Sequence, residues 1–138
     1  MTGRIAGTIA LLVLTGGLGA AALASPDRTP PTFGGVKSAT TCTPGPIVGQ
    51  VSSYELTWDS ATDDVTPSTQ IVYDIYQATK SGGEDFSSPT YTVRHGATTF
   101  ATPPLPADEL FYFVVRARDR AGNRDSNLVE RAGVNLCV

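Results

Sequence analysis

Cysteine, histidine and tryptophan are scarce in this chain of 138 residues, which contains two, one and one of them. So few sulfur and imidazole ligands argue against a structural zinc cluster and against a disulfide-rich scaffold. The GxSxG, HExxH and Walker motifs of common enzymes are also absent. The single histidine, His95, precedes Gly96 in an expected turn, where a solvated role is typical. We therefore interpret the chain as noncatalytic.

Positive charge is also in short supply. Ten Lys and Arg residues stand against thirteen Asp and Glu residues, which gives a net charge of −3. The arginines between Arg116 and Arg131 are interleaved with acids. Nothing in this charge pattern favours nucleic acid as a partner, and we exclude that class.

Long apolar runs are missing after the N-terminal segment. From Ile5 to Leu23 the chain is apolar or small, and it ends at Ala24 in a small-residue site of the kind that signal peptidase cleaves. We interpret residues 1–24 as a signal peptide and residues 25–138 as one exported domain. The alternative is an uncleaved anchor, since the segment approaches the roughly 20 residues that span a bilayer. The chain would then be a membrane-tethered envelope protein.

The two cysteines, Cys42 and Cys137, both belong to the exported part. Because secreted proteins mature in an oxidising compartment, we expect them to form a disulfide. The expected location is secreted or in the cell envelope, outside the cytoplasm.

A helical period is absent from the exported part, where short runs of alternating apolar residues are separated by turn-forming clusters. This pattern predicts an all-β fold with seven strands, at residues 32–39, 52–59, 70–79, 90–94, 98–102, 109–119 and 127–137. Alternate residues of a strand point to the same face of its sheet. On three of these strands the alternation predicts a set of residues that point into the core, the inward set: Tyr54, Leu56, Trp58, Ile71, Tyr73, Ile75, Phe111, Phe113 and Val115. Seven short strands in about a hundred residues favour a β-sandwich.

Four segments resemble the fibronectin type III family, in the form found in exported bacterial proteins. They are DRTPP before the first strand, YELTW in the second, IVYDIY in the third and FYFVVRARDRAGN in the sixth. The resemblance covers residues 27–138 and implies a Greek-key β-sandwich with the immunoglobulin-like fold. The chain departs from the family at Phe111, which occupies the position where the family usually has a hydrogen-bonding tyrosine. The resemblance also implies that Cys42 and Cys137 lie at the same pole of the sandwich.

Acidic and amide side chains gather in segments that the resemblance brings to one pole. Hard oxygen ligands of this kind suit Ca²⁺, which takes six to eight oxygens. The candidate calcium ligands are Asp27, Asp59, Asp63, Asp64, Asp119, Asn123 and Asp125. The alternative is turn chemistry, because Asp and Asn commonly cap their own backbone in tight turns. No other cofactor is expected.

A second candidate site is the outward face of the third and sixth strands. Its members are Tyr76, Tyr112, Val114 and Arg116, a composition that interfaces favour. The alternative is that cross-strand pairs of this kind only stiffen the sheet.

Together these features predict a monomeric recognition or scaffold module. Its partner would be a protein or a polysaccharide, and it would have no membrane contact once the signal peptide is removed. A calcium-binding adhesion-type domain is the alternative that the acidic segments suggest.

Overall fold

The computed structural model describes residues 25–42 and 49–137, so the predicted signal peptide, residues 1–24, lies outside the described residues. Within these ranges the chain forms ten β-strands and one short 3-10 helix, Ser68–Gln70, and no α-helix. The all-β prediction is confirmed. Nowhere in the described part is there a helix long and apolar enough to cross a membrane.

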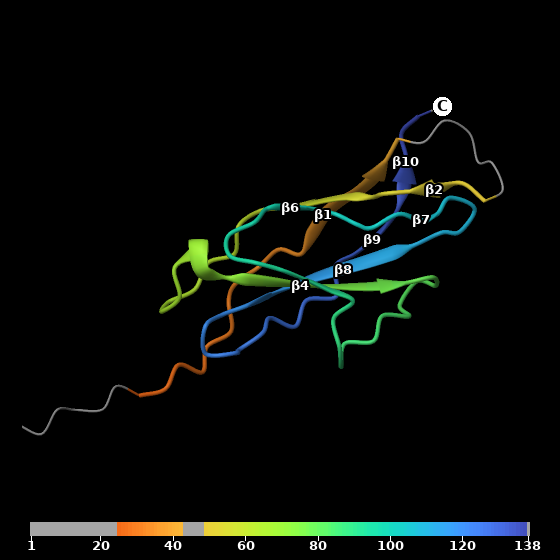
Figure 1. Cartoon of the computed structure of the whole chain (residues 1–138). Helices are drawn as coiled ribbons and strands as arrows, with labels where there is room; N and C mark the ends of the chain where they lie inside the picture. The colour runs from red at the N-terminus through yellow and green to blue at the C-terminus, as the bar shows by residue number, and fades with distance from the viewer. Residues whose placement is uncertain (1–24, 43–48, 138) are drawn as a thin grey trace, which may run out of the picture.

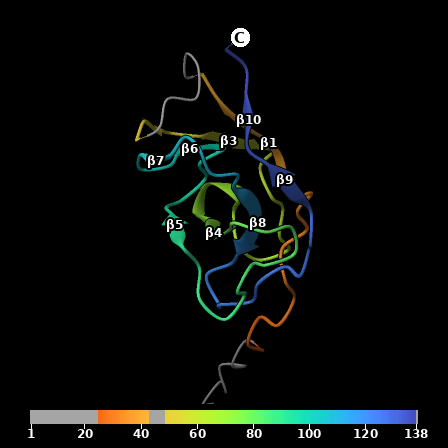
Figure 2. The same cartoon turned by 90° about the vertical axis from the view of Figure 1, so that its right-hand side faces the viewer.

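Eight strands form two four-stranded sheets, which are visible as separate layers in Figure 2. The first sheet has the order β10-β1-β3-β6, from β10 (Val134–Asn135), β1 (Val36–Thr41), β3 (Glu55–Trp58) and β6 (Thr99–Ala101). The second has the order β5-β4-β8-β9, from β5 (Tyr91–Val93), β4 (Val72–Ala78), β8 (Tyr112–Arg118) and β9 (Glu130–Ala132). The remaining pair, β2 (Val51–Ser52) and β7 (Leu105–Pro106), forms a small antiparallel ladder.

The core lies between the two sheets, and every residue of the predicted inward set belongs to it. The most exposed of the nine, Tyr54, retains only 5% of its surface. The ring of Trp58 on β3 lies 5.3 Å from that of Tyr73 on β4, so aromatic contacts join the two sheets. The Trp58 indole nitrogen donates to the carbonyl oxygen of Ala97 at 2.8 Å. This shared core makes the fold sandwich-like.

The prediction of seven strands is wrong at two places where the chain leaves one ladder for another. The predicted strand 52–59 divides into β2 and β3, because the Tyr54 amide donates to the Thr102 hydroxyl and not to a strand carbonyl. The predicted strand 127–137 divides at Gly133, between β9 in one sheet and β10 in the other. The strand β7 was not predicted.

The predicted disulfide between Cys42 and Cys137 is confirmed. It follows the parallel pairing of β1 with β10, in which Thr41 lies opposite Asn135. The segment that begins at Ser25 lies at the other end of the molecule from the described C-terminal end (Figure 1). The disulfide therefore ties together one end of the sandwich, and the polar loops near the N-terminal segment occupy the opposite end.

Candidate recognition surface

The predicted aromatic face does point away from the core, but the expectation that it is open to solvent is wrong. Tyr76 and Val114, neighbours on β4 and β8, are each 1% exposed. Tyr112 and Arg116 are half-buried. Only the margin of this face can therefore meet a partner directly, and the composition that suggested an interface belongs mainly to buried packing.

The loop between β4 and β5 covers this face. The Phe86 ring packs edge-on against Tyr76, with 5.0 Å between the ring centroids. Arg116 then stacks on Phe86, with its guanidinium carbon 3.7 Å from the ring centroid. Glu130 on β9 fastens the start of the loop, because its carboxylate accepts hydrogen bonds from the Ser81 hydroxyl and the Gly82 amide.

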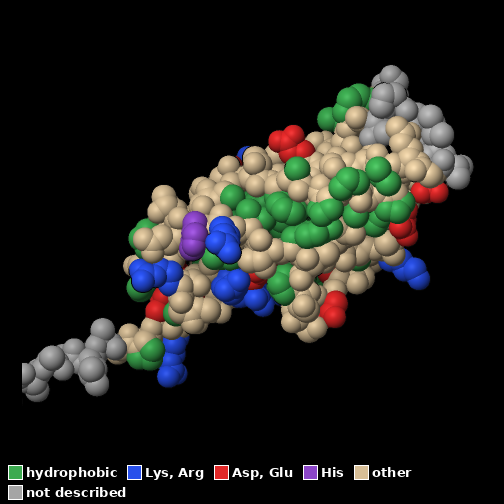
Figure 3. Space-filling model, in the orientation of Figure 1, with side chains coloured by type: hydrophobic (Ala, Val, Ile, Leu, Met, Phe, Trp, Pro, Cys, Tyr) green, Lys and Arg blue, Asp and Glu red, His purple; other side chains and the backbone are tan. Residues whose placement is uncertain are grey.

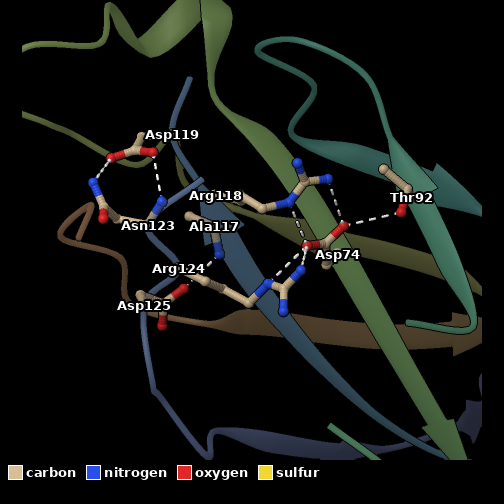
Figure 4. Close-up of polar contacts among 8 residues, drawn as sticks. All are labelled: Asp74, Thr92, Ala117, Arg118, Asp119, Asn123, Arg124 and Asp125. Atoms are coloured by element: carbon tan, nitrogen blue, oxygen red, sulfur yellow. Dashed lines mark hydrogen bonds and ion pairs between the residues drawn. The ribbon is translucent and has the colours of Figure 1, made fainter. Parts of the chain in front are cut away.

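A buried ionic cluster lies beside the covered face, and sequence reasoning missed it. Asp74 on β4 is 0% exposed, yet it carries a carboxylate. That carboxylate receives the guanidinium groups of Arg118 and Arg124, each at 2.8 Å, and the hydroxyl of Thr92 at 2.9 Å (Figure 4). The ladders β5-β4-β8 bring these residues together from three strands and a following turn.

The protonation of Asp74 follows from these contacts. Burial alone would raise the pKa of its carboxyl group. The hydrogen bonds from Arg118 and Thr92 and the charges of both arginines outweigh burial, so the pKa of Asp74 lies below its ordinary value. Asp74 is therefore ionised at neutral pH, and it also raises the pKa of the Arg118 guanidinium.

The predicted calcium ligands are brought together only in part. Carboxylate oxygens of Asp27, Asp63 and Asp64 lie within 4.8 Å of one another. The Oδ1 of Asp27 accepts from the Thr29 amide, and the Oδ2 of Asp63 accepts from the Val65 and Thr66 amides. The other carboxylate oxygen of each residue is buried without a hydrogen-bond partner. Two oxygens at this group are thus available to a cation.

The other four predicted ligands have structural roles elsewhere. Asp119 accepts from the amide and the side chain of Asn123, which closes the turn after β8 (Figure 4). Asp125 accepts from the Ala117 and Asn127 amides. Asp59 is exposed and pairs with Lys37 on the first sheet. The turn-chemistry alternative therefore describes Asp119, Asn123 and Asp125, while Asp59 takes part in a surface ion pair.

His95 lies in the turn between β5 and β6, where it is exposed. Its Nδ1 is 3.5 Å from the carbonyl oxygen of Gln70. The neighbouring Gly96 has a φ of 68°, and its amide donates to the Ile71 carbonyl. The histidine thus belongs to a tight turn that is fixed against the start of β4.

Hydrophobic side chains also gather in a band along the middle of the face drawn in Figure 3. The half-buried apolar residues that pack on the core include Tyr91 and Val93 on β5 and Phe100 on β6. The rings of Tyr91 and Phe100 lie 5.2 Å apart and join the edge strands of the two sheets. This contact shields the core on the side of the sandwich where β5 and β6 lie.

Comparison with protein-family models, with curated proteins and with solved structures finds no match to this chain.

Proposed function

We propose that this chain is a secreted, noncatalytic recognition or scaffold module that binds a protein or a polysaccharide at or outside the cell surface. Its fold would be a Greek-key sandwich of the fibronectin type III kind. The run β1-β3-β6 within the first sheet, β10-β1-β3-β6, and the order β5-β4-β8-β9 of the second support that assignment, since sandwiches of this class place their strands in such an arrangement. The disulfide is compatible with an oxidising compartment outside the cytoplasm.

The observation that carries the proposal is an outer sheet face on which ion pairs hold polar side chains in place. The side chains of Arg118 and Arg124 are both held on Asp74, while 31% and 32% of their surfaces stay exposed. Groups that are already ordered lose little conformational freedom when a partner binds. A scaffold of this kind can recognise a partner by holding its binding groups in a fixed arrangement.

Export of the full chain tests the first half of the proposal. A copy with a C-terminal tag, produced in a secretion-competent bacterial host, should appear outside the cytoplasmic membrane. Mass spectrometry should find a chain that begins at Ser25 and has no free thiol. A membrane-bound chain that begins at Met1 would instead support the tethered alternative. A cytoplasmic chain with two free thiols would contradict export.

Binding tests the second half. The exported protein, immobilised through its tag, should retain a polysaccharide or an exported protein of its host in a surface plasmon resonance measurement. Reduction of the disulfide should weaken that binding, because the end of the sandwich is then no longer tied. Turnover of a substrate, lost on His95→Ala, would contradict the noncatalytic assignment.

Calcium binding is a second candidate function, favoured by the buried and unpartnered oxygens of Asp27 and Asp63. Asp64 is exposed and lies in the same group, so it adds a third carboxylate to the hard ligands gathered there. A shallow hollow of about 330 Å³ adjoins them, lined by residues 62–68. A cation there would replace the missing hydrogen-bond partners of the two buried oxygens.

Thermal unfolding with added calcium tests this second candidate. A hundredfold excess over the Kd should stabilise the fold by about 2.7 kcal/mol and raise the Tm accordingly. Asp64→Asn should remove the shift, whereas Asp59→Asn should keep it because Asp59 pairs with Lys37 elsewhere. An unchanged Tm at millimolar calcium would contradict the candidate.

A further inference from the structure

Three arginines follow one another across the outer face of the second sheet, and we name Arg94, Arg118 and Arg124 the arginine row. Val72 on β4 lies opposite Arg118 on β8, and Arg118 lies opposite Arg124. One step beyond the pairing of Tyr73 with Val93, the same register places Arg94 beside Val72. Directly paired residues share a sheet face, and Tyr73 and Val93 pack on the core. The three arginines therefore occupy the outer face.

Acids and arginines that are interleaved in the sequence lie at different depths in the fold. Three acids near the row, Asp74, Asp119 and Asp125, are 0%, 3% and 8% exposed. The arginines reach the surface, and Arg94 is exposed. Figure 3 shows Lys and Arg side chains gathered at the end of the molecule that carries the histidine. The part of the outer face around the row is thus positive at its surface, whereas the acids Glu84, Asp85 and Glu130 lie with the loop between β4 and β5 farther along the face.

Two arginines of the row are positioned before any ligand arrives. Arg118 and Arg124 each use Nε and Nη2 to bind the Asp74 carboxylate. The remaining terminal nitrogen of each guanidinium points away from Asp74 (Figure 4). Arg94 has no hydrogen-bond or ion-pair partner in the described ranges 25–42 and 49–137. Donors for an anion are therefore present on all three side chains.

The spacing of the row indicates a ligand with more than one anionic group. Neighbouring strands lie about 4.8 Å apart, so Arg94 and Arg118, two strands apart, are separated by roughly 10 Å. Arg118 and Arg124 are adjacent. A single small anion cannot bridge such a row, whereas a polymer that carries an acid on successive units can contact it at several points.

The surroundings of the row favour a polysaccharide over a protein. Protein interfaces are centred on large apolar or aromatic anchors that become desolvated. The strongly exposed large apolar residues of the described chain are Val51, Val65, Leu110, Leu128, Val134 and Leu136, and none of them lies on β4, β5 or β8. Between Arg94 and Arg118 there is only the half-buried Val72. A polar, hydrated chain of sugars matches this surface.

We propose that the arginine row binds an acidic polysaccharide by contacting the carboxylate groups of the sugar chain. The free guanidinium of Arg94 can match a carboxylate with two parallel hydrogen bonds, as Arg118 does with Asp74 within the fold, and Arg118 and Arg124 each add the terminal nitrogen that Asp74 leaves free. This inference rests on the proposed recognition function and names the ligand class for it.

Affinity electrophoresis of the full exported chain tests the inference, with alginate as a polyuronate, dextran as a neutral polymer and polyglutamate as an acidic peptide. Alginate should retard the protein, less strongly as salt rises. Dextran should have no effect, and polyglutamate should bind more weakly than alginate. Retardation by polyglutamate equal to that by alginate would overturn the assignment to a polysaccharide.

Arg94 is the residue to change, because Arg118 and Arg124 also hold Asp74. Arg94→Gln should weaken alginate binding about tenfold, the effect of one charge-assisted contact. Arg94→Lys should retain part of the affinity, because the charge stays but the fork is lost. The matched control is Lys37→Gln, which removes the same charge from β1 on the other sheet and should leave binding unchanged.

The outcomes separate this inference from the function on which it rests. Equal affinities for Arg94→Gln and the wild type would overturn the arginine row as the site. Retardation by dextran without retardation by alginate would overturn the inference and leave the recognition function standing. Retention in the cytoplasm would overturn the proposed function, whatever the affinity for alginate.

Discussion

Asp74 shows how one residue can organise the polar side of a sheet. Its carboxylate is fully buried on the central strand β4, where an unpaired charge would cost several kcal/mol. Two guanidinium groups and one hydroxyl satisfy it, which keeps the carboxylate ionised. The same contacts orient Arg118 and Arg124, so the charge that stabilises the sheet also prepares its outer surface.

We predict that Asp74→Asn lowers the free energy of unfolding at neutral pH by about 3 kcal/mol, because it breaks a buried ion pair. The folded-state pKa of Asp74 is lowered, so its contribution to stability is present above the ordinary pKa of 3.8. That contribution is lost as the pH falls through the folded pKa. Urea unfolding across this acidic range should show a steeper loss for the wild type than for the variant.

The control for this prediction is Asp59→Asn. The Asp59 side chain is 80% exposed and its ion pair with Lys37 lies in solvent, so the change should cost less than about 1 kcal/mol. An Asp74→Asn variant as stable as Asp59→Asn at neutral pH would contradict the role given to the cluster.

At the scale of elements, two segments have conformations that depend on contacts with distant parts of the chain. The last predicted strand changes sheets at Gly133, whose amide donates to the Phe111 carbonyl. The loop between β4 and β5 folds back over β4 and buries Tyr76 under Phe86. The loop thereby covers part of a sheet face that the strands alone would leave open.

Gly133→Ala should destabilise the fold by about 1 to 3 kcal/mol, the usual cost of overpacking. A Cβ atom there would lie 2.4 Å from the Tyr54 ring, which is itself in the core. Gly34→Ala is the matched control, because nothing lies within 4 Å of its Cβ position. In thermal unfolding, the Tm of Gly133→Ala should lie well below that of the wild type, and the Tm of Gly34→Ala should lie close to it. Equal Tm values for the two variants would contradict the prediction.

Phe86→Ala should loosen the loop between β4 and β5 and expose Tyr76. Because Phe86 is half-buried, we expect a loss of about 2 kcal/mol, below the 3 to 5 typical of a fully buried ring. Hydrogen exchange at the Gly82 amide, which donates a hydrogen bond to the Glu130 carboxylate, should become faster. Leu128→Ala, at a residue that is 70% exposed, should change neither quantity. Unchanged exchange at Gly82 in the Phe86 variant would show that this packing does not hold the loop.

At the scale of the whole molecule, the disulfide joins residues that are 95 positions apart. It lies beside the short parallel pairing of β1 with β10, which has only two residue pairs in its register. Such a short ladder contributes little stability by itself, so the crosslink holds the terminal strand on the first sheet.

Cys42→Ser should therefore lower the free energy of unfolding by up to about 4.7 kcal/mol, the chain-entropy value for a loop near this length. The loss should appear only under oxidising conditions, and with reductant the wild type should match the variant. Urea unfolding of both proteins, with and without reductant, measures this difference. If reductant leaves the urea unfolding transition of the wild type unchanged, the disulfide does not contribute to stability.

Much of the fold could be predicted because period-two alternation is a local property. Trp58, Ile75 and Phe113 lie at alternating positions with other apolar residues of their strands, and each is buried in the core as predicted. The same alternation also assigned Tyr76 and Val114 to the outer face of the sheet. Two cysteines in a chain that we expect to be exported were sufficient to predict their pairing.

Alternation along a strand does not predict which distant segment packs over a residue that points away from the core. Only the tertiary structure decided that Phe86 buries Tyr76, and that Asp27 meets Asp63 while Asp119 closes its own turn. Likewise, the sequence mixes arginines with acids, and strand register places the buried carboxylate of Asp74 against Arg118 and Arg124, which still reach the surface. The physical reason is that alternation follows from the geometry of a single strand, whereas coverage and charge sorting follow from long-range pairing.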